Sequence, residues 1–159
     1  MNRWLRILAG LALAVAAATT PAVGTAQPSA RRVSAEVFVI LARTDAGTID
    51  PDLAGMPALR RPPFSNFRSM ELLSRERFEL AASTPQEIDL PNGRKVRIAL
   101  EEQTPDGRHR MRVSINRPNQ ADYLPLLQVV AAAGDPFFVA GQQHLGGTLI
   151  IGIRLIPAG

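Results

Sequence analysis

The sequence predicts an all-β fold, a single-domain antiparallel β-sandwich or a sandwich-like barrel. From residue 33 onward apolar and polar residues mostly alternate, which is the period of a strand. Proline, glycine and asparagine separate these runs at short intervals, and there is no cysteine, so stability must come from a packed core. We therefore expect about seven to nine short strands and at most one short helix, near residues 52–61.

Residues 1–26 have the layout of a secretory signal peptide. Arg3 and Arg6 precede a twelve-residue apolar run, and small residues before Gln27 form a cleavage site. The run is shorter than the ~20 residues that span a bilayer. We expect export to the periplasm or the extracellular space, a flexible stretch at 27–32, and a mature chain without a transmembrane segment. Because no cysteine is present, we do not expect the exported protein to be a lipoprotein.

The charge of the chain does not point to nucleic acid. Without Arg3 and Arg6 there are 16 basic and 14 acidic side chains, so the mature net charge is about +2 and not +4. An exported protein also lies in a different compartment from nucleic acid. The partners that remain are an envelope protein or an anionic polymer.

The β domain is expected to cover residues 33–159. Residues 33–43 form the first strand, covered on both faces, and a long Pro/Gly-rich connection follows at 45–63. Residues 64–82 fit either a helix or two strands, 67–73 and 77–80, and the all-β surroundings favour strands. The later strands are expected at 86–90, 94–102, 108–117, 124–132, 137–142 and 148–156.

Side-chain parity fixes the pairing of the strands at 94–102 and 108–117. If their apolar residues share one face, Leu100 lies opposite Met111, and Thr104 to Gly107 close the hairpin. This register also places Glu101 opposite Arg110. One turn earlier, Gly93 is expected to be left-handed.

The strands expected at 86–90, 94–102 and 108–117 form a meander, and its outward face is strongly basic. Residues 92–117 carry seven basic and three acidic side chains, including Arg97, Arg108, Arg110 and Arg112. One interpretation is a solvated sheet face, because runs of charge usually serve solubility. The other is a binding site for anionic polymers or an acidic partner.

Few residues indicate catalysis, and we predict no metal and no cofactor. There is no nucleophile elbow, zinc-protease motif or phosphate-binding glycine loop. The predicted register sets His109 opposite Glu102. This pair would act either as a proton shuttle or as an ordinary structural pair at the end of a sheet. Asp50 and Asp52 flank a proline and fit either a Ca²⁺ contact or a loop cap.

The C-terminal residues 137–156 are expected to form a hairpin around a loop at 143–147 that contains His144. Gly152 lacks a side chain inside the last strand, which indicates either a central strand or close approach by another protein's backbone. The sequence therefore favours an exported, non-enzymatic binding or assembly domain. The alternatives are a small hydrolase that uses Glu102 and His109 or His144, and a subunit that pairs its last strand with a partner's sheet.

Overall fold

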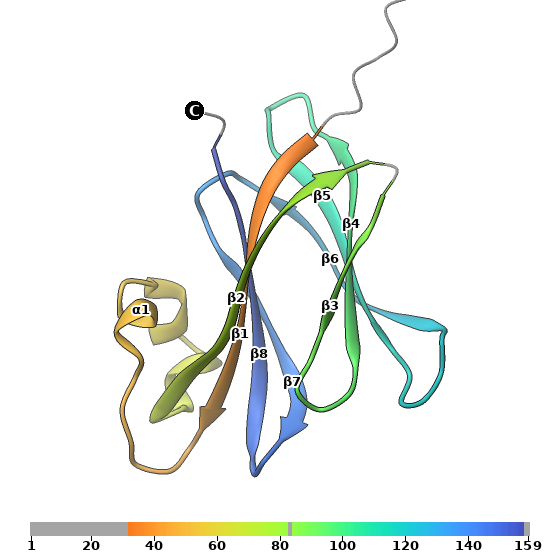
Figure 1. Ribbon diagram of the computed structural model, residues 1–159. Coiled ribbons are helices and arrows are strands. Elements are labelled where there is room, and N and C mark those ends of the chain that lie inside the picture. The colour runs from red at the N-terminus through yellow and green to blue at the C-terminus, as the bar shows by residue number, and fades with distance from the viewer. Residues whose placement is uncertain (1–31, 83, 158–159) are drawn as a thin grey trace, which may run out of the picture.

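Two antiparallel four-stranded sheets pack face to face in the computed structural model, which describes residues 32–82 and 84–157 (Figure 1). The first sheet has the order β2-β1-β8-β7, and the second has the order β3-β4-β5-β6. The prediction of an all-β fold is confirmed. The strands are β1 (Arg32–Arg43), β2 (Ser69–Ala81), β3 (Gln86–Asp89), β4 (Lys95–Gln103), β5 (His109–Asn116), β6 (Tyr123–Ala131), β7 (Phe137–His144) and β8 (Gly147–Leu155).

The predicted signal peptide and residues 27–31 of the predicted flexible stretch 27–32 lie outside the described residues, whereas Arg32 is the first residue of β1. Within the part that the structure describes, no helix is long and apolar enough to cross a membrane.

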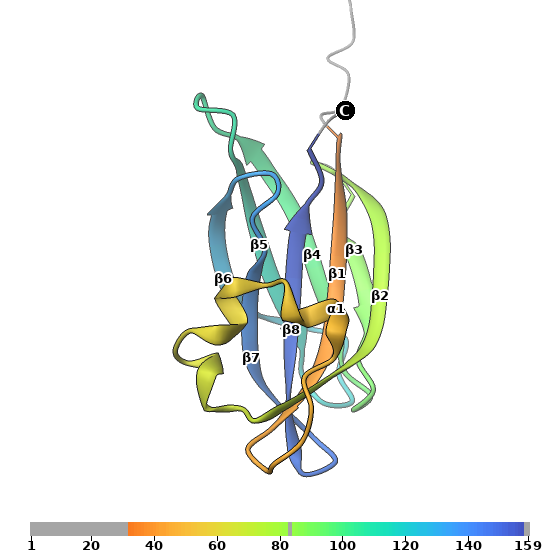
Figure 2. The ribbon, with the colours of Figure 1, turned by 90° about the vertical axis from the view of Figure 1, so that its left-hand side faces the viewer.

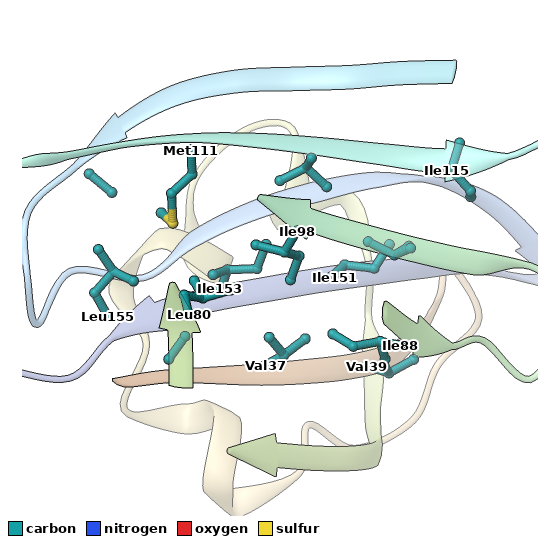
Figure 3. Close-up of a cluster of buried hydrophobic side chains, with 14 of the residues drawn as sticks. Val37, Val39, Leu80, Ile88, Ile98, Met111, Ile115, Ile151, Ile153 and Leu155 are labelled. Carbon is teal, nitrogen blue, oxygen red and sulfur yellow. The ribbon is translucent and has the colours of Figure 1, made fainter. Parts of the chain in front are cut away.

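The main core fills the space between the two sheets. Alternate residues of β1, β4, β5 and β8 point into it, as the period of two requires. Figure 3 shows Val37 and Val39 of β1 facing Ile98 of β4, with Ile151 and Ile153 of β8 beside them. All five side chains are buried. Burial of this kind stabilises the fold by ~25 cal/mol for each Å² of apolar surface removed from water.

A second apolar cluster lies on the outer face of the first sheet, under a cap formed by residues 50–67. The cap contains α1 (Pro51–Ala54) and the 3-10 turns η1 (Pro57–Arg60) and η2 (Phe64–Asn66). The side chain of Asp50 accepts a hydrogen bond from the amide of Asp52 at 3.0 Å and so begins α1, with Pro51 in the first helical position. Leu53, Leu59 and Phe64 of the cap pack on Phe38, Ile40 and Ile150 of the sheet.

The cap covers only part of this outer face. Figure 2 shows it crossing in front of β1 and β8, while the upper ends of these strands remain uncovered. The structure thus confirms that the middle of β1 is buried on both sides. It also confirms one short helix in the expected region.

Residues 64–82 follow the strand interpretation with one correction. η2 comes first, and β2 then runs without a break from Ser69 to Ala81 instead of splitting in two. A bulge accommodates the irregular pattern, because Val39 pairs with Ser74 while Ile40 pairs with Leu72. Leu73 is the extra residue, and it shifts the side-chain alternation that made the sequence ambiguous.

The turn between β7 and β8 is tighter than predicted. His144 pairs directly with Gly147, so only Leu145 and Gly146 form the turn. Both have positive φ, at 44° and 73°, as a type I′ hairpin turn requires. His144 therefore lies at the end of a strand and not in a five-residue loop.

Candidate functional site

The basic face of the meander is matched by its own carboxylates. Arg97 contacts Glu87 at 2.7 Å, and Arg110 contacts Glu102 at 2.6 Å. Five cations on this surface each have an acidic partner: Lys95 with Asp89, Arg97 with Glu87, Arg108 with Asp106, Arg110 with Glu102, and Arg112 with Glu101. Exposed one-to-one pairs of this kind contribute ~0–1 kcal/mol each. Their charge is compensated locally, which favours the solvated-face interpretation.

Near the end of the hairpin, a bulge in β4 makes the pairing differ from the one that the sequence predicted. Leu100 lies opposite Met111, and Gly93 is left-handed with a φ of 81°, both as expected. Beyond Leu100 the register shifts by one residue, so Arg110 lies opposite Glu102 and not Glu101.

The same shift separates the residues of the proposed catalytic pair. His109 lies opposite Gln103, and the carboxylate of Glu102 is bound to Arg110. Burial lowers the pKa of the His109 imidazole, whose Nδ1 has no hydrogen-bond partner among the described residues. The structure therefore does not assemble the Glu102/His109 pair.

His144 and the aspartates of the long connection form no metal centre. Asp50 caps α1, which is the loop-cap interpretation. Within residues 32–82 and 84–157, no three His, Asp or Glu side chains lie close enough together to hold a metal ion.

Gly152 occupies a central strand, where it makes room for two aromatic rings. It lies between Phe38 of β1 and Phe138 of β7 across the first sheet. A Cβ atom at this position would be 2.6 Å from a ring carbon of Phe138 and 3.3 Å from one of Phe38. The close neighbours are thus side chains of the same chain. β8 is hydrogen-bonded to β1 on one side and to β7 on the other, so it is a central strand and has no free edge for a partner's sheet.

The strands that do form edges carry features that hinder pairing with another chain. β2 and β7 have bulges at Leu73 and Gly141, and β6 has a bulge at Leu126 beside Pro125. β3 is only four residues long. Bulges, proline and short edge strands all interrupt the ladder that an incoming strand would need. β6 also leaves apolar side chains exposed, among them Leu124 and Val130.

A cluster that the sequence analysis missed lies on the open part of the first sheet. Glu36 of β1 is 1% exposed, although it carries a carboxylate. Arg75 and Arg77 of β2 donate to its Oε1 at 2.7 and 3.0 Å. Arg154 of β8 donates to its Oε2 from Nε at 3.1 Å and also from Nη2. We call Glu36, Arg75, Arg77 and Arg154 the arginine cluster.

Strand pairing brings this cluster together. Glu36 lies directly between Arg77 on one neighbouring strand and Arg154 on the other. Arg75 lies opposite Phe38, two residues along β1 on the same face. The guanidinium carbons of Arg75 and Arg154 are each 5.4 Å from the centroid of the Phe38 ring, within the range of a cation–π contact.

The arginines keep Glu36 ionised. Burial raises the pKa of this carboxyl group, but hydrogen bonds from Arg75, Arg154 and Arg77 outweigh burial and lower the pKa to about 2. The side chains of Arg75, Arg77 and Arg154 are 44%, 65% and 32% exposed, so solvent reaches all three. One carboxylate thus holds three cations at the surface, and two positive charges are not compensated within the cluster.

Two surface hollows lie elsewhere. The larger, of about 730 Å³, runs along residues 45–51 and 69–71 beside the start of the cap. The smaller, of about 430 Å³, contains the predicted site residue Arg97, whose guanidinium carbon stacks 3.7 Å from the ring centroid of Tyr123. In both hollows the charged side chains are mixed in sign, because Arg43 and Glu71 line one and Arg97 and Glu87 line the other.

Comparison with models of protein families, with curated proteins and with solved structures found no match.

Proposed function

We propose that this protein is an exported, non-enzymatic binding domain that uses the arginine cluster to bind an anionic component of the cell envelope. The proposal of export is supported by the arrangement of residues 1–26 in the sequence. The surface for binding is the uncovered part of the first sheet, on the opposite side of the sandwich from the meander face that the sequence suggested.

The observation that supports this proposal most strongly is the charge imbalance around Glu36. Three guanidinium groups meet one buried carboxylate, whereas each meander cation named above has its own acid. Guanidinium groups are suited to binding carboxylate and phosphate oxygens through paired hydrogen bonds. An anion bound to the arginine cluster would offset positive charges that repel one another. An anion on the meander face would instead have to compete with the carboxylates that already pair with its cations.

Two matched double substitutions test this proposal. Arg75→Gln with Arg77→Gln removes two charges from the cluster, and Arg110→Gln with Arg112→Gln removes two from the meander. We expect the first variant to elute from a polyanionic resin at a clearly lower salt concentration than the wild type. The second variant should elute close to the salt concentration of the wild type. Circular dichroism must show that both variants are folded.

Equal losses of retention in the two variants would mean that net charge alone governs binding. A greater loss of retention in the meander variant would indicate that the binding surface lies on the other sheet. Either result would overturn the proposal.

A further inference from the structure

We propose that the arginine cluster is a binding site for a phosphomonoester group and that Glu36 is its positioning residue. This inference rests on the proposed function, because it names the chemical group that the same surface would bind. It is supported by the charge left in the cluster, the hydrogen-bond donors left free by Glu36, and the buried side chains of Glu36 and Phe38 that orient the arginines.

The charge of the cluster matches a doubly charged anion. Three arginines and one ionised carboxylate leave a net charge of two. A phosphomonoester carries about −1.5 to −2 at pH 7, whereas a carboxylate or a phosphodiester carries about −1. Asp52 on the cap also acts on Arg75 through its charge, and Glu79 farther along β2 accepts a hydrogen bond from Ser34. Of these three anionic groups, a phosphomonoester is the one that would compensate both charges.

Glu36 leaves most of the arginine donors free. It receives four N–H bonds, one each from Arg75 and Arg77 and two from Arg154. Each guanidinium group has five N–H donors, and Arg75 uses only Nε, so both of its terminal nitrogens are free of Glu36. Three phosphate oxygens can accept bonds from several such donors at once.

Glu36 and Phe38 together orient the guanidinium groups of Arg75 and Arg154. Glu36 is buried in the middle of a sheet, and the ring of Phe38 supports Arg75 and Arg154 from below. Phe38 is itself 1% exposed and packs under the cap. Arginines ordered in advance lose less conformational entropy when a ligand binds, which favours affinity and selectivity. Glu36 therefore acts through the arginines and does not contact the ligand.

Vesicle binding provides the test. The mature protein is sedimented with vesicles that contain phosphatidic acid, a phosphomonoester, or phosphatidylglycerol, a phosphodiester, at matched surface potential. We expect wild-type protein to bind phosphatidic acid about tenfold more tightly, as one or two additional charge-assisted hydrogen bonds would produce. The Arg110→Gln, Arg112→Gln variant should keep this preference, and the Arg75→Gln, Arg77→Gln variant should lose it.

Glu36→Gln separates a formed site from simple charge attraction. This substitution raises the net charge of the cluster, so nonspecific attraction predicts tighter binding to both vesicles. If Glu36 positions the arginines, the ratio of the affinity for phosphatidic acid vesicles to that for phosphatidylglycerol vesicles should instead fall toward one. An unchanged preference in a folded Glu36→Gln protein would overturn the positioning role.

Glycerol 3-phosphate distinguishes a soluble source of the phosphate from a lipid source. Displacement of the protein from phosphatidic acid vesicles would show that the phosphate group alone is recognised. No displacement, with the preference retained, would assign the ligand to a membrane surface. Both results support the phosphomonoester site.

Failure of the inference can be told apart from failure of the proposed function. Equal binding of both vesicles by the wild type, lost only in the Arg75→Gln, Arg77→Gln variant, would overturn the phosphomonoester assignment and keep the anion-binding function. Wild-type protein that bound neither vesicle nor the polyanionic resin would overturn both.

Discussion

Replacing Glu36 by glutamine should destabilise the protein at neutral pH and much less in acid. Burial raises the pKa of the carboxyl group, but the hydrogen bonds from the arginines outweigh burial, so the pKa falls from 4.5 to about 2. A shift of this size corresponds to about 3 kcal/mol of stability at neutral pH. Glutamine resembles the protonated acid, so the variant should lack this contribution. A loss of about 3 kcal/mol leaves a protein of ordinary stability folded.

The direction of the pH dependence follows from the lowered pKa. Folding favours the ionised form of Glu36, so its contribution is complete above pH 4.5 and is lost as the pH falls through about 2. The stability difference between wild type and Glu36→Gln should therefore be about 3 kcal/mol at pH 6.5 and about half of that at pH 3.

Urea unfolding at the two pH values measures this difference. The only tryptophan is Trp4, in the predicted signal peptide, so circular dichroism is a better probe than fluorescence. Glu87→Gln is the control, because Glu87 forms an exposed ion pair with Arg97 and should cost no more than ~1 kcal/mol. A difference between wild type and Glu36→Gln that stayed constant from pH 6.5 to pH 3 would refute the assignment of the stability to ionised Glu36.

Three further predictions concern packing and processing. Gly152→Val should lower stability by ~1–3 kcal/mol, because its side chain would meet the ring of Phe138, whereas Gly55→Ala, with no atom within 4 Å of the new Cβ, should not destabilise. Wild-type stability in Gly152→Val would contradict this packing. Leu100→Ala should cost ~2–5 kcal/mol in urea unfolding, since Leu100 is 3% exposed. N-terminal sequencing of exported protein should begin at or near Gln27, and an intact Met1 would argue against cleavage.

The alternation of side chains predicted most of the strands because inward and outward positions have different chemistry. It also predicted the pairing of Leu100 with Met111, since only one parity keeps both hairpin strands facing the core. The alternation fails where a strand contains an extra residue. Leu73 and Glu101 both lie at such bulges, and their neighbouring residues give no turn signal. Pairings beyond Leu100, including that of His109, were therefore displaced by one residue.

Side-chain alternation could not predict the arginine cluster, because the members of the cluster come from strands that are far apart in the chain. Glu36 and Arg154 are separated by 118 positions and meet only because β8 inserts between β1 and β7. One signal was present in the sequence. Glu36 is the only charged residue within residues 33–42, a segment that is otherwise almost entirely apolar, and it shares a face with Phe38. A charge buried in such a strand needs partners, and here the partners are arginines.

Charge counted along the chain and charge counted on a surface lead to different sites in this protein. Residues 92–117 carry a net charge of +4, but Glu87 and Asp89 lie just outside this segment and on the neighbouring strand β3, where they pair with Arg97 and Lys95. The net charge of that face is therefore smaller than the segment suggests. The arginine cluster shows the reverse, because its three cations are spread over two strands with acidic residues between them in sequence. An antiparallel sheet places alternate residues on opposite faces, so the carboxylate of Glu76 leaves the face that Arg75 and Arg77 share. For this fold, the balance of charge on each face of a sheet is the quantity that identifies a candidate anion site.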